Sequence, residues 1–196
     1  MSLSELTDVL TSLPGLGPRQ ARRVVEYLLR KDSAYRERLA ALIAGARLEV
    51  SECTRCFRFD APSASGLCRT CADGSRDASL LMVVEHDVDI DAIEAALTYR
   101  GYYFVLGGLL NLVKQRKDKI LRTRELLERI TPEVREVICA LAATPEGDYT
   151  AKELMTQIRA ARPGVAVSVL GRGLSVGAEL EYADPETLRS ALKNRG

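Results

Sequence analysis

The stretch that decides the fold is residues 80–108, which read LLMVVEHDVDIDAIEAALTYRGYYFVLGG. Its first five residues are all apolar, as expected for a short strand that is buried on both faces. Apolar residues then recur at helical spacing as far as Gly101, and residues 102–106 form a second apolar run that ends at two glycines. A strand, a helix and another strand in this order predict a parallel unit with a right-handed crossover.

The same alternation continues toward the C-terminus. A helical pattern at 126–130 comes before an apolar strand at 136–143. A helix over 150–161 then comes before a strand at 165–170. We therefore predict an α/β fold with a parallel sheet, whose ligands would bind beyond the carboxyl ends of the strands.

Acidic residues are predicted at that edge of the sheet. Glu85 ends the first strand, and Glu146 and Asp148 follow the third. Carboxylates are ligands that Mg²⁺ prefers, so a weak Mg²⁺ site at these three residues is one interpretation. Solvated charges and helix caps are the alternative. His86, the only histidine, adjoins Glu85 without an identifiable catalytic partner, and we interpret it as a surface or packing residue.

Four of the five cysteines form two C-x-x-C pairs, and eleven residues separate the pairs. The cysteines are Cys53, Cys56, Cys68 and Cys71. Two tight turns of this kind can aim four thiolates at one ion, which predicts a structural zinc site with no open position for catalysis. The alternative is two disulfides or free thiols. The fifth, Cys139, lies in an apolar run and is predicted to be a small buried hydrophobe.

The first fifty residues predict three helices around a glycine turn. Apolar residues recur at helical spacing before and after Leu13-Pro14-Gly15-Leu16-Gly17-Pro18, and again from about Ser33. Such a helix-hairpin-helix offers backbone N–H groups and a helix N-terminus to a phosphate. We expect sequence-independent DNA contacts at Gly15, Gly17, Arg19, Arg22 and Arg23. The alternative is an ordinary turn in a helical bundle.

The charge of the chain is balanced in total but uneven along its length. The 196 residues include 28 Lys and Arg against 27 Asp and Glu, and 46% are hydrophobic, which is globular rather than disordered composition. Basic residues nevertheless gather at 19–23 and 114–124. The second cluster is either a DNA-facing stripe or a solvated helix face. No signal peptide or membrane span is visible, which predicts a cytoplasmic protein without membrane contact.

Several motifs occur in the order typical of one family. They are residues 13–23, the four-cysteine segment, Val83-Val84-Glu85, residues 105–108 and GRGLSVGAELEYAD at 171–184. Together they resemble the RecR family of bacterial recombination mediators. Three places depart from the family pattern: residues 85–89, the loop after Gly108, and a shortened loop before Glu146.

The resemblance implies four domains. These are a helix-hairpin-helix module (1–52), a four-cysteine zinc finger (53–78), a Toprim domain with a Rossmannoid sheet (79–171) and a C-terminal segment described in the family as Walker-B-like (172–196). No Walker A sequence accompanies that segment, so ATP hydrolysis is not expected.

The resemblance also implies a function without catalysis. RecR proteins form ring-like homo-oligomers, here a dimer or a tetramer, that bind DNA and work with RecO and RecF to load the recombinase in DNA repair. Two other functions compete with this one. The first is an Mg²⁺-dependent Toprim nuclease or primase-like enzyme that uses the acidic residues, and the second is a structural protein-interaction module.

Overall fold

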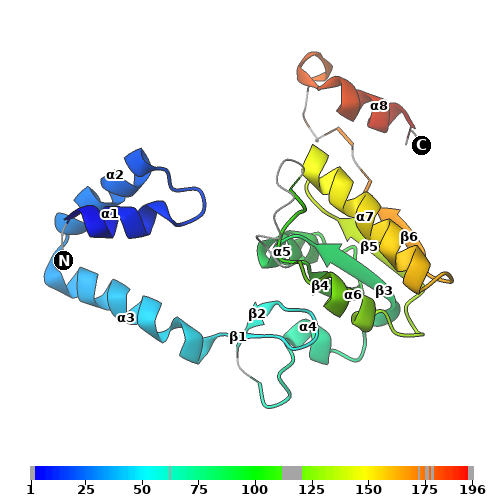
Figure 1. Ribbon diagram of the computed structural model, residues 1–196, viewed down its shortest axis with the longest axis horizontal. Helices are drawn as coiled ribbons and strands as arrows, with labels where there is room; N and C mark the ends of the chain where they lie inside the picture. Colours follow the sequence, from blue (N-terminus) through cyan, green and yellow to red (C-terminus); the bar gives the residue numbers. More distant parts are fainter. Residues whose placement is uncertain are drawn as a thin grey trace. The chain divides into compact units, whose positions relative to one another are not determined.

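A computed structural model describes residues 3–61, 63–111, 121–171, 173–174, 177 and 179–193 (Figure 1). The chain divides into two compact units, Met1–Val50 and Ser51–Gly196. No helix among the described residues is both long enough and apolar enough to cross a membrane.

The first unit contains the three predicted helices, α1 (Leu3–Thr11), α2 (Pro18–Leu29) and α3 (Ser33–Glu49). The turn between α1 and α2 uses Gly15 at φ 80°, a conformation that favours glycine. Pro18 opens α2, where its missing N–H costs nothing. α3 begins after Asp32, whose carboxylate accepts a hydrogen bond from the Tyr35 N–H at 2.7 Å.

Little of the first unit is buried. Ala21 and Val25 of α2 are the core residues of its described part, and α1 packs beside α2. Large apolar side chains remain exposed along all three helices, among them Leu42, Ile43 and Leu48 of α3. A core of this size contributes little burial energy to the unit.

The second unit is built on the predicted parallel sheet. Its strands are β3 (Asp77–Val84), β4 (Gly101–Val105), β5 (Glu136–Ala140) and β6 (Ala166–Val169). They lie in the order β4-β3-β5-β6, and every neighbouring pair is parallel. The prediction of an α/β fold with a parallel sheet is therefore confirmed.

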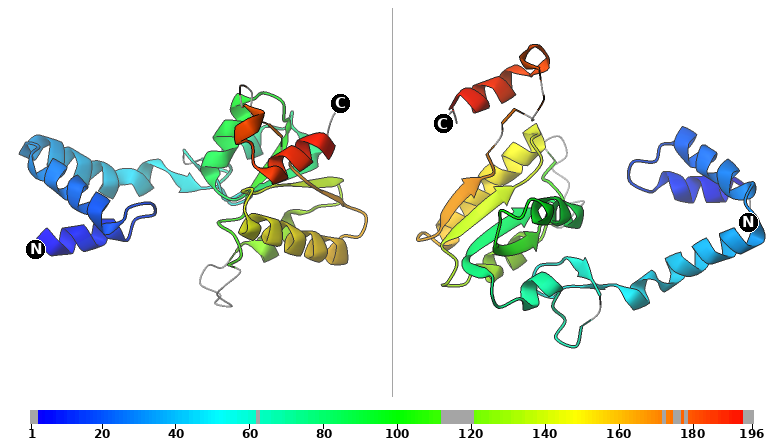
Figure 2. Two further views of the ribbon diagram at one scale, coloured as in Figure 1. Left: turned by 90° about the horizontal axis from the view of Figure 1, so that it is seen from above. Right: turned by 180° about the vertical axis from the view of Figure 1, so that it is seen from behind.

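Helices cover both faces of this sheet (Figure 2). Their bounds are Asp87–Ala95 for α5, Thr123–Arg129 for α6 and Pro145–Ala161 for α7. Alternate strand residues point to opposite faces. Leu81 and Val83 therefore pack with α6 and α7, while Met82 and Val84 pack with α5. Cys139 is fully buried in β5, as predicted.

α7 begins earlier than its predicted start at Thr150. Pro145 occupies its first turn, and the Thr144 hydroxyl accepts a hydrogen bond from the Gly147 N–H at 3.1 Å. The Pro-Glu-Gly-Asp sequence, which precedes the predicted helix, is therefore its capped first turn. This correction places Glu146 and Asp148 on a helix rather than on a loop.

The two-stranded ribbon β1 (Ser51–Glu52) and β2 (Phe59–Asp60) and the short helix α4 (Arg69–Ala72) carry the four paired cysteines. The segment 51–76, called here the cysteine segment, lies along the edge strand β4. The Val105 N–H donates to the Cys56 carbonyl at 2.8 Å, and the Tyr102 hydroxyl donates to the Asp73 carbonyl at 2.9 Å. The cysteine segment thus covers a sheet edge that would otherwise expose backbone groups.

The chain ends in a 3₁₀ turn, Leu180–Tyr182, and a helix, α8 (Pro185–Lys193). Asp184 caps α8, because its carboxylate accepts a hydrogen bond from the Thr187 N–H at 3.0 Å. Several positions of the 171–184 motif, including Arg172, lie outside the described residues.

Candidate metal centre and nucleic-acid interface

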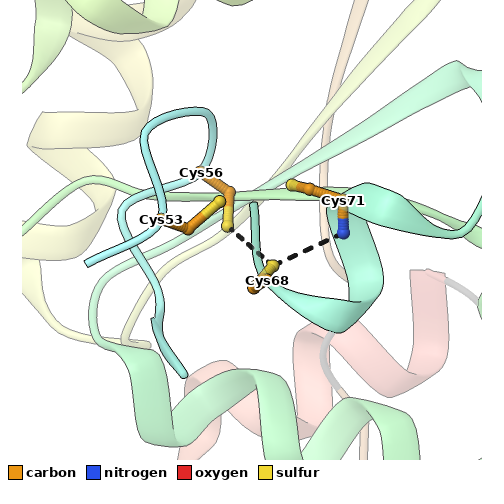
Figure 3. A group of neighbouring side chains, drawn as sticks. All are labelled: Cys53, Cys56, Cys68 and Cys71. Atoms are coloured by element: carbon orange, nitrogen blue, oxygen red, sulfur yellow. Dashed lines mark hydrogen bonds between the residues drawn. The ribbon is translucent and has the colours of Figure 1, made fainter. Parts of the chain in front are cut away.

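The four paired cysteines come from two tight turns that meet (Figure 3). Cys53 and Cys56 lie on the turn between β1 and β2, while Cys68 caps α4 and Cys71 lies within it. All four are buried. None of them forms a disulfide in the described structure, so free thiols are the alternative to a metal site that is left.

The four sulfur atoms fit a tetrahedral metal ion. They all lie within 4.8 Å of one another, and Cys56 Sγ is 3.5 Å from Cys68 Sγ. A zinc ion with bonds of about 2.3 Å would place its sulfur ligands about 3.8 Å apart. The cluster can therefore hold a metal ion by small adjustments of its side chains.

Hydrogen bonds already favour a thiolate at this site. Hydrogen bonds from Cys56 and Cys71 lower the pKa of the Cys68 thiol to about 2, and the Cys71 N–H lies 3.4 Å from the same sulfur. Sharing the proton with Cys68 raises the pKa of Cys56. A thiolate is the form that binds metal, so Cys68 is suited to be a ligand, whereas the raised pKa values of Cys56 and Cys71 mean that an ion must displace their protons as it binds.

Phe57 and Arg58 attach the first cysteine turn to the sheet domain. Phe57 adopts φ 63° and packs edge-on against Phe104 at 5.4 Å between ring centres. The Arg58 guanidinium forms ion pairs with Asp87, at 3.2 Å, and with Asp91 on α5. Desolvation opposes these pairs, since burial raises the pKa of Asp87.

Arg76 attaches the other end of the cysteine segment to the same helix. Its Nη1 donates to Glu94 at 2.9 Å and to the Gly101 carbonyl at 3.0 Å. Asp87, Asp91 and Glu94 follow helical spacing, so two arginines contact one acidic face of α5. The sequence reasoning missed this pair of contacts. The sequence gives one indication of these contacts: an arginine follows each cysteine pair, and the acidic residues of the later helix are spaced as i, i+4 and i+7, at 87, 91 and 94.

The acidic residues at the strand ends do not converge in the same way. Glu85 follows β3 and lies 3.6 Å from His86, whereas Glu146 and Asp148 lie in the first turn of α7. Among the described residues, the four cysteines are the only group of three or more metal-ligating side chains whose ligand atoms lie this close together. The Mg²⁺ site at Glu85, Glu146 and Asp148 stays a prediction.

His86, the residue next to Glu85, has a structural role at the start of a helix. His86 begins α5 in a capping box with Asp89, whose carboxylate accepts from the His86 N–H at 2.8 Å. This agrees with the interpretation of His86 as a surface or packing residue.

The glycine turn between α1 and α2 presents its predicted residues at the surface. Arg19, Arg22 and Arg23 are all exposed. Gly17 caps α2 without a side-chain hydrogen bond to the first N–H groups of the helix. Arg22 forms an exposed pair with Glu26 at 3.5 Å. A pair of this kind contributes little, so an anion can displace it.

The second basic cluster is only partly within the described residues. Residues 112–120, and with them four of its six basic side chains, lie outside. The Arg122 guanidinium has partners within the protein. It forms an ion pair with Glu52, donates a hydrogen bond to the Val105 carbonyl at 3.2 Å and lies over the Phe57 ring. Arg124 is exposed and pairs with Glu128 at 3.1 Å.

Family models match three parts of the chain. A RecR helix-hairpin-helix model matches residues 3–47, a Toprim domain model matches 79–171, and a RecR C-terminal model matches 173–195.

Curated relatives match almost the whole chain. A Recombination protein RecR from Porphyromonas gingivalis is 40% identical, with 98% of this chain and 91% of the relative aligned. Proteins of the same name from Phenylobacterium zucineum and Bdellovibrio bacteriovorus are 40% and 33% identical and align over 94% and 96% of their own lengths. At this identity and coverage, together with the cysteine cluster and the parallel sheet, the chain belongs to the RecR family.

Proposed function

We propose that the chain is a DNA-binding mediator of recombinational DNA repair that assists recombinase loading together with RecO and RecF-type partners. The observation that carries the proposal is the exposed turn between α1 and α2, where a glycine-capped helix N-terminus stands beside three arginines. Membership of a family of recombination proteins supports the same role.

The chemistry of this turn suits the DNA backbone rather than the bases. Accessible N–H groups and the positive end of α2 favour a phosphate, and Gly15 and Gly17 permit its close approach. Arg19, Arg22 and Arg23 add charge without a fixed donor pattern for base edges. Binding should therefore be independent of sequence and should weaken steeply with salt.

The ion in the cysteine cluster is proposed to be zinc, about one per chain, with a structural role. Four thiolates with tetrahedral spacing are typical of structural zinc and leave no position for a substrate. The domains are proposed to be 1–52, 53–78, 79–171 and 172–196, and the site of action the cytoplasm.

A homo-oligomer, either a dimer or a tetramer ring, is proposed as the active form. One glycine turn contacts only one or two phosphates, so several turns on one assembly would gain affinity through avidity. We propose no catalytic turnover. The competing Mg²⁺-dependent nuclease or primase-like function has no comparable support, because its three acidic residues form no close cluster.

The test replaces two arginines of α2. The variant Arg19→Ala with Arg22→Ala should bind oligonucleotides of unrelated sequence equally poorly, about tenfold or more below the wild type, with a shallower salt dependence. The control, Arg36→Ala with Arg38→Ala on α3, removes the same charge from the same unit and should bind nearly as the wild type does. Equal binding by both double variants would contradict the role of the turn.

A further inference from the structure

The arginines near the cysteine cluster divide into two kinds. Arg58 and Arg76 have carboxylate partners on α5, and Arg69 of α4 pairs with Asp60 at 3.6 Å. Arg55 and Arg129 have none among the ion pairs of the described residues, although Arg55 reaches the Cys71 carbonyl and the charge of Arg129 interacts with Cys71 and Cys56. Arg129 in particular needs an explanation, because its Nε is buried without a hydrogen-bond partner and the like charge of Arg55 repels it.

Arg55 lies between the first two cysteines in sequence and reaches the second pair in space. Its Nη1 is 3.5 Å from the Cys71 carbonyl oxygen. The contact is long for a hydrogen bond and its oxygen is uncharged, so it does not neutralise the guanidinium.

Arg129 is the last residue of α6 and contacts β4, the edge strand that the cysteine segment covers. Its guanidinium lies over the Tyr102 ring at 5.4 Å, and the Tyr102 hydroxyl donates to the carbonyl of Asp73, two residues beyond Cys71. The Arg129 Nε is buried and has no hydrogen-bond partner. Burial and then repulsion from Arg55 lower the pKa of Arg129, while Cys71 and Cys56 act in the opposite direction.

The charge of a metal-loaded cluster matches these two arginines. A divalent ion bound by four thiolates keeps a net charge of minus two, inside a site whose sulfur ligands are all buried. Buried charge is costly unless a counter-charge lies nearby. Two guanidinium groups supply the opposite charge, and each would gain the anion that it lacks.

We infer that Arg55 and Arg129 are positioning residues that balance the charge of the metal tetrathiolate and so hold the ion in the cluster. The inference rests on the proposed zinc site. It adds that retention of the ion depends on two arginines that are not ligands themselves. Outer groups of this kind typically change metal affinity by 10- to 100-fold when removed.

The experiment measures release of zinc from the full-length, zinc-loaded chain to a chromogenic chelator. Arg55→Gln and Arg129→Gln should each release zinc about tenfold faster than the wild type, and Arg129→Lys should release it at nearly the wild-type rate because it keeps the charge. Arg124→Gln is the matched control, since it removes the same charge from the exposed side of the same helix and should change nothing.

The outcomes separate the inference from the proposal on which it rests. A wild type that purifies without zinc, and takes up none when reconstituted, overturns both. A wild type that holds zinc, with Gln variants that release it within about twofold of its rate, overturns the charge-balance inference alone. If Arg129→Gln does not fold, the exposed Arg55 decides, because Arg55→Gln removes no packed side chain. Co²⁺ spectra that retain the tetrahedral tetrathiolate bands would show that the ligand set itself is intact in the variants.

Discussion

Two groups of residues carry the chemistry of a metal site in the sequence, and the fold treats them differently. The four cysteines meet, with all sulfur atoms within 4.8 Å of one another. The acidic residues Glu85, Glu146 and Asp148 lie near the ends of parallel strands without forming such a group. The geometry of a C-x-x-C pair can be predicted from the sequence, whereas that of carboxylates on separate elements cannot.

A C-x-x-C pair fixes most of its geometry locally, because one tight turn aims both thiolates in the same direction. Only the meeting of the two turns depends on tertiary structure. Carboxylates on separate elements depend on it entirely. Glu85 directly follows β3, whereas Glu146 belongs to the first turn of a helix whose start is set by the Thr144 cap.

The largest expected effect comes from removing one metal ligand. Cys68→Ala should lose the bound zinc and several kcal/mol of stability, since structural zinc contributes on the order of 10 kcal/mol to small zinc-dependent folds. Metal content and thermal unfolding would be measured. Cys139→Ala is the control: the same change in the sheet core should cost about 1 kcal/mol and leave zinc bound. Equal losses of zinc and of stability in the two variants would contradict the assignment of Cys68 as a metal ligand and of Cys139 as a core residue.

The second test concerns the turn that places the acidic residues. A Cβ added at Gly147 would lie 1.9 Å from the Ala142 carbonyl oxygen, so Gly147→Ala should destabilise the chain by about 3 kcal/mol in chemical unfolding. Gly164→Ala, which meets no atom within 4 Å, should cost less than about 0.5 kcal/mol. Similar stability of both variants would show that the start of α7 can shift, and with it Glu146.

The third test examines how the cysteine segment is attached to α5. Hydrogen bonds from Arg76 hold the pKa of Glu94 below its usual value. The ionised carboxyl therefore stabilises the fold above its unfolded-state pKa, and this contribution is lost as pH falls through the lowered folded-state pKa.

Glu94→Gln should accordingly cost about 1 to 2 kcal/mol at neutral pH, and the difference from the wild type should vanish in acid. Unfolding measured across pH would reveal it. Glu128→Gln, in an exposed pair on α6, should cost less than about 0.5 kcal/mol at every pH. A pH-independent loss in Glu94→Gln would mean that shape rather than charge makes this contact.

The smallest expected effect is that of Mg²⁺. Millimolar Mg²⁺ should stabilise the chain by less than about 0.5 kcal/mol, because three dispersed carboxylates bind it weakly. Thermal unfolding of the wild type and Glu85→Gln with and without the ion would measure this. A larger stabilisation by Mg²⁺ that disappears in Glu85→Gln would show that the acidic residues form a metal site.

Much of the architecture was predictable because its signals are local. Five apolar residues at 80–84 mark a strand buried on both faces, and the alternation of strands and helices implies a parallel sheet. The start of α7 was not predictable with the same rules, since a threonine cap and a proline look alike in a loop and in a first helical turn. The surroundings of Arg122 were not predictable either. In the sequence it is one basic residue of a basic cluster, but in the structure it is partly buried and contacts Glu52 and Phe57.

The sequence by itself determined the candidate metal ligands, the order of the elements and the glycine turn, because each depends on residues that are close together in the chain. Only the tertiary structure decided what surrounds them. It laid the cysteine segment along β4, paired Arg58 and Arg76 with α5, and placed Arg55 beside the Cys71 carbonyl and Arg129 over the Tyr102 ring without carboxylate partners. These contacts join residues that are far apart in sequence, so their geometry exists only once the sheet has formed and brought them together.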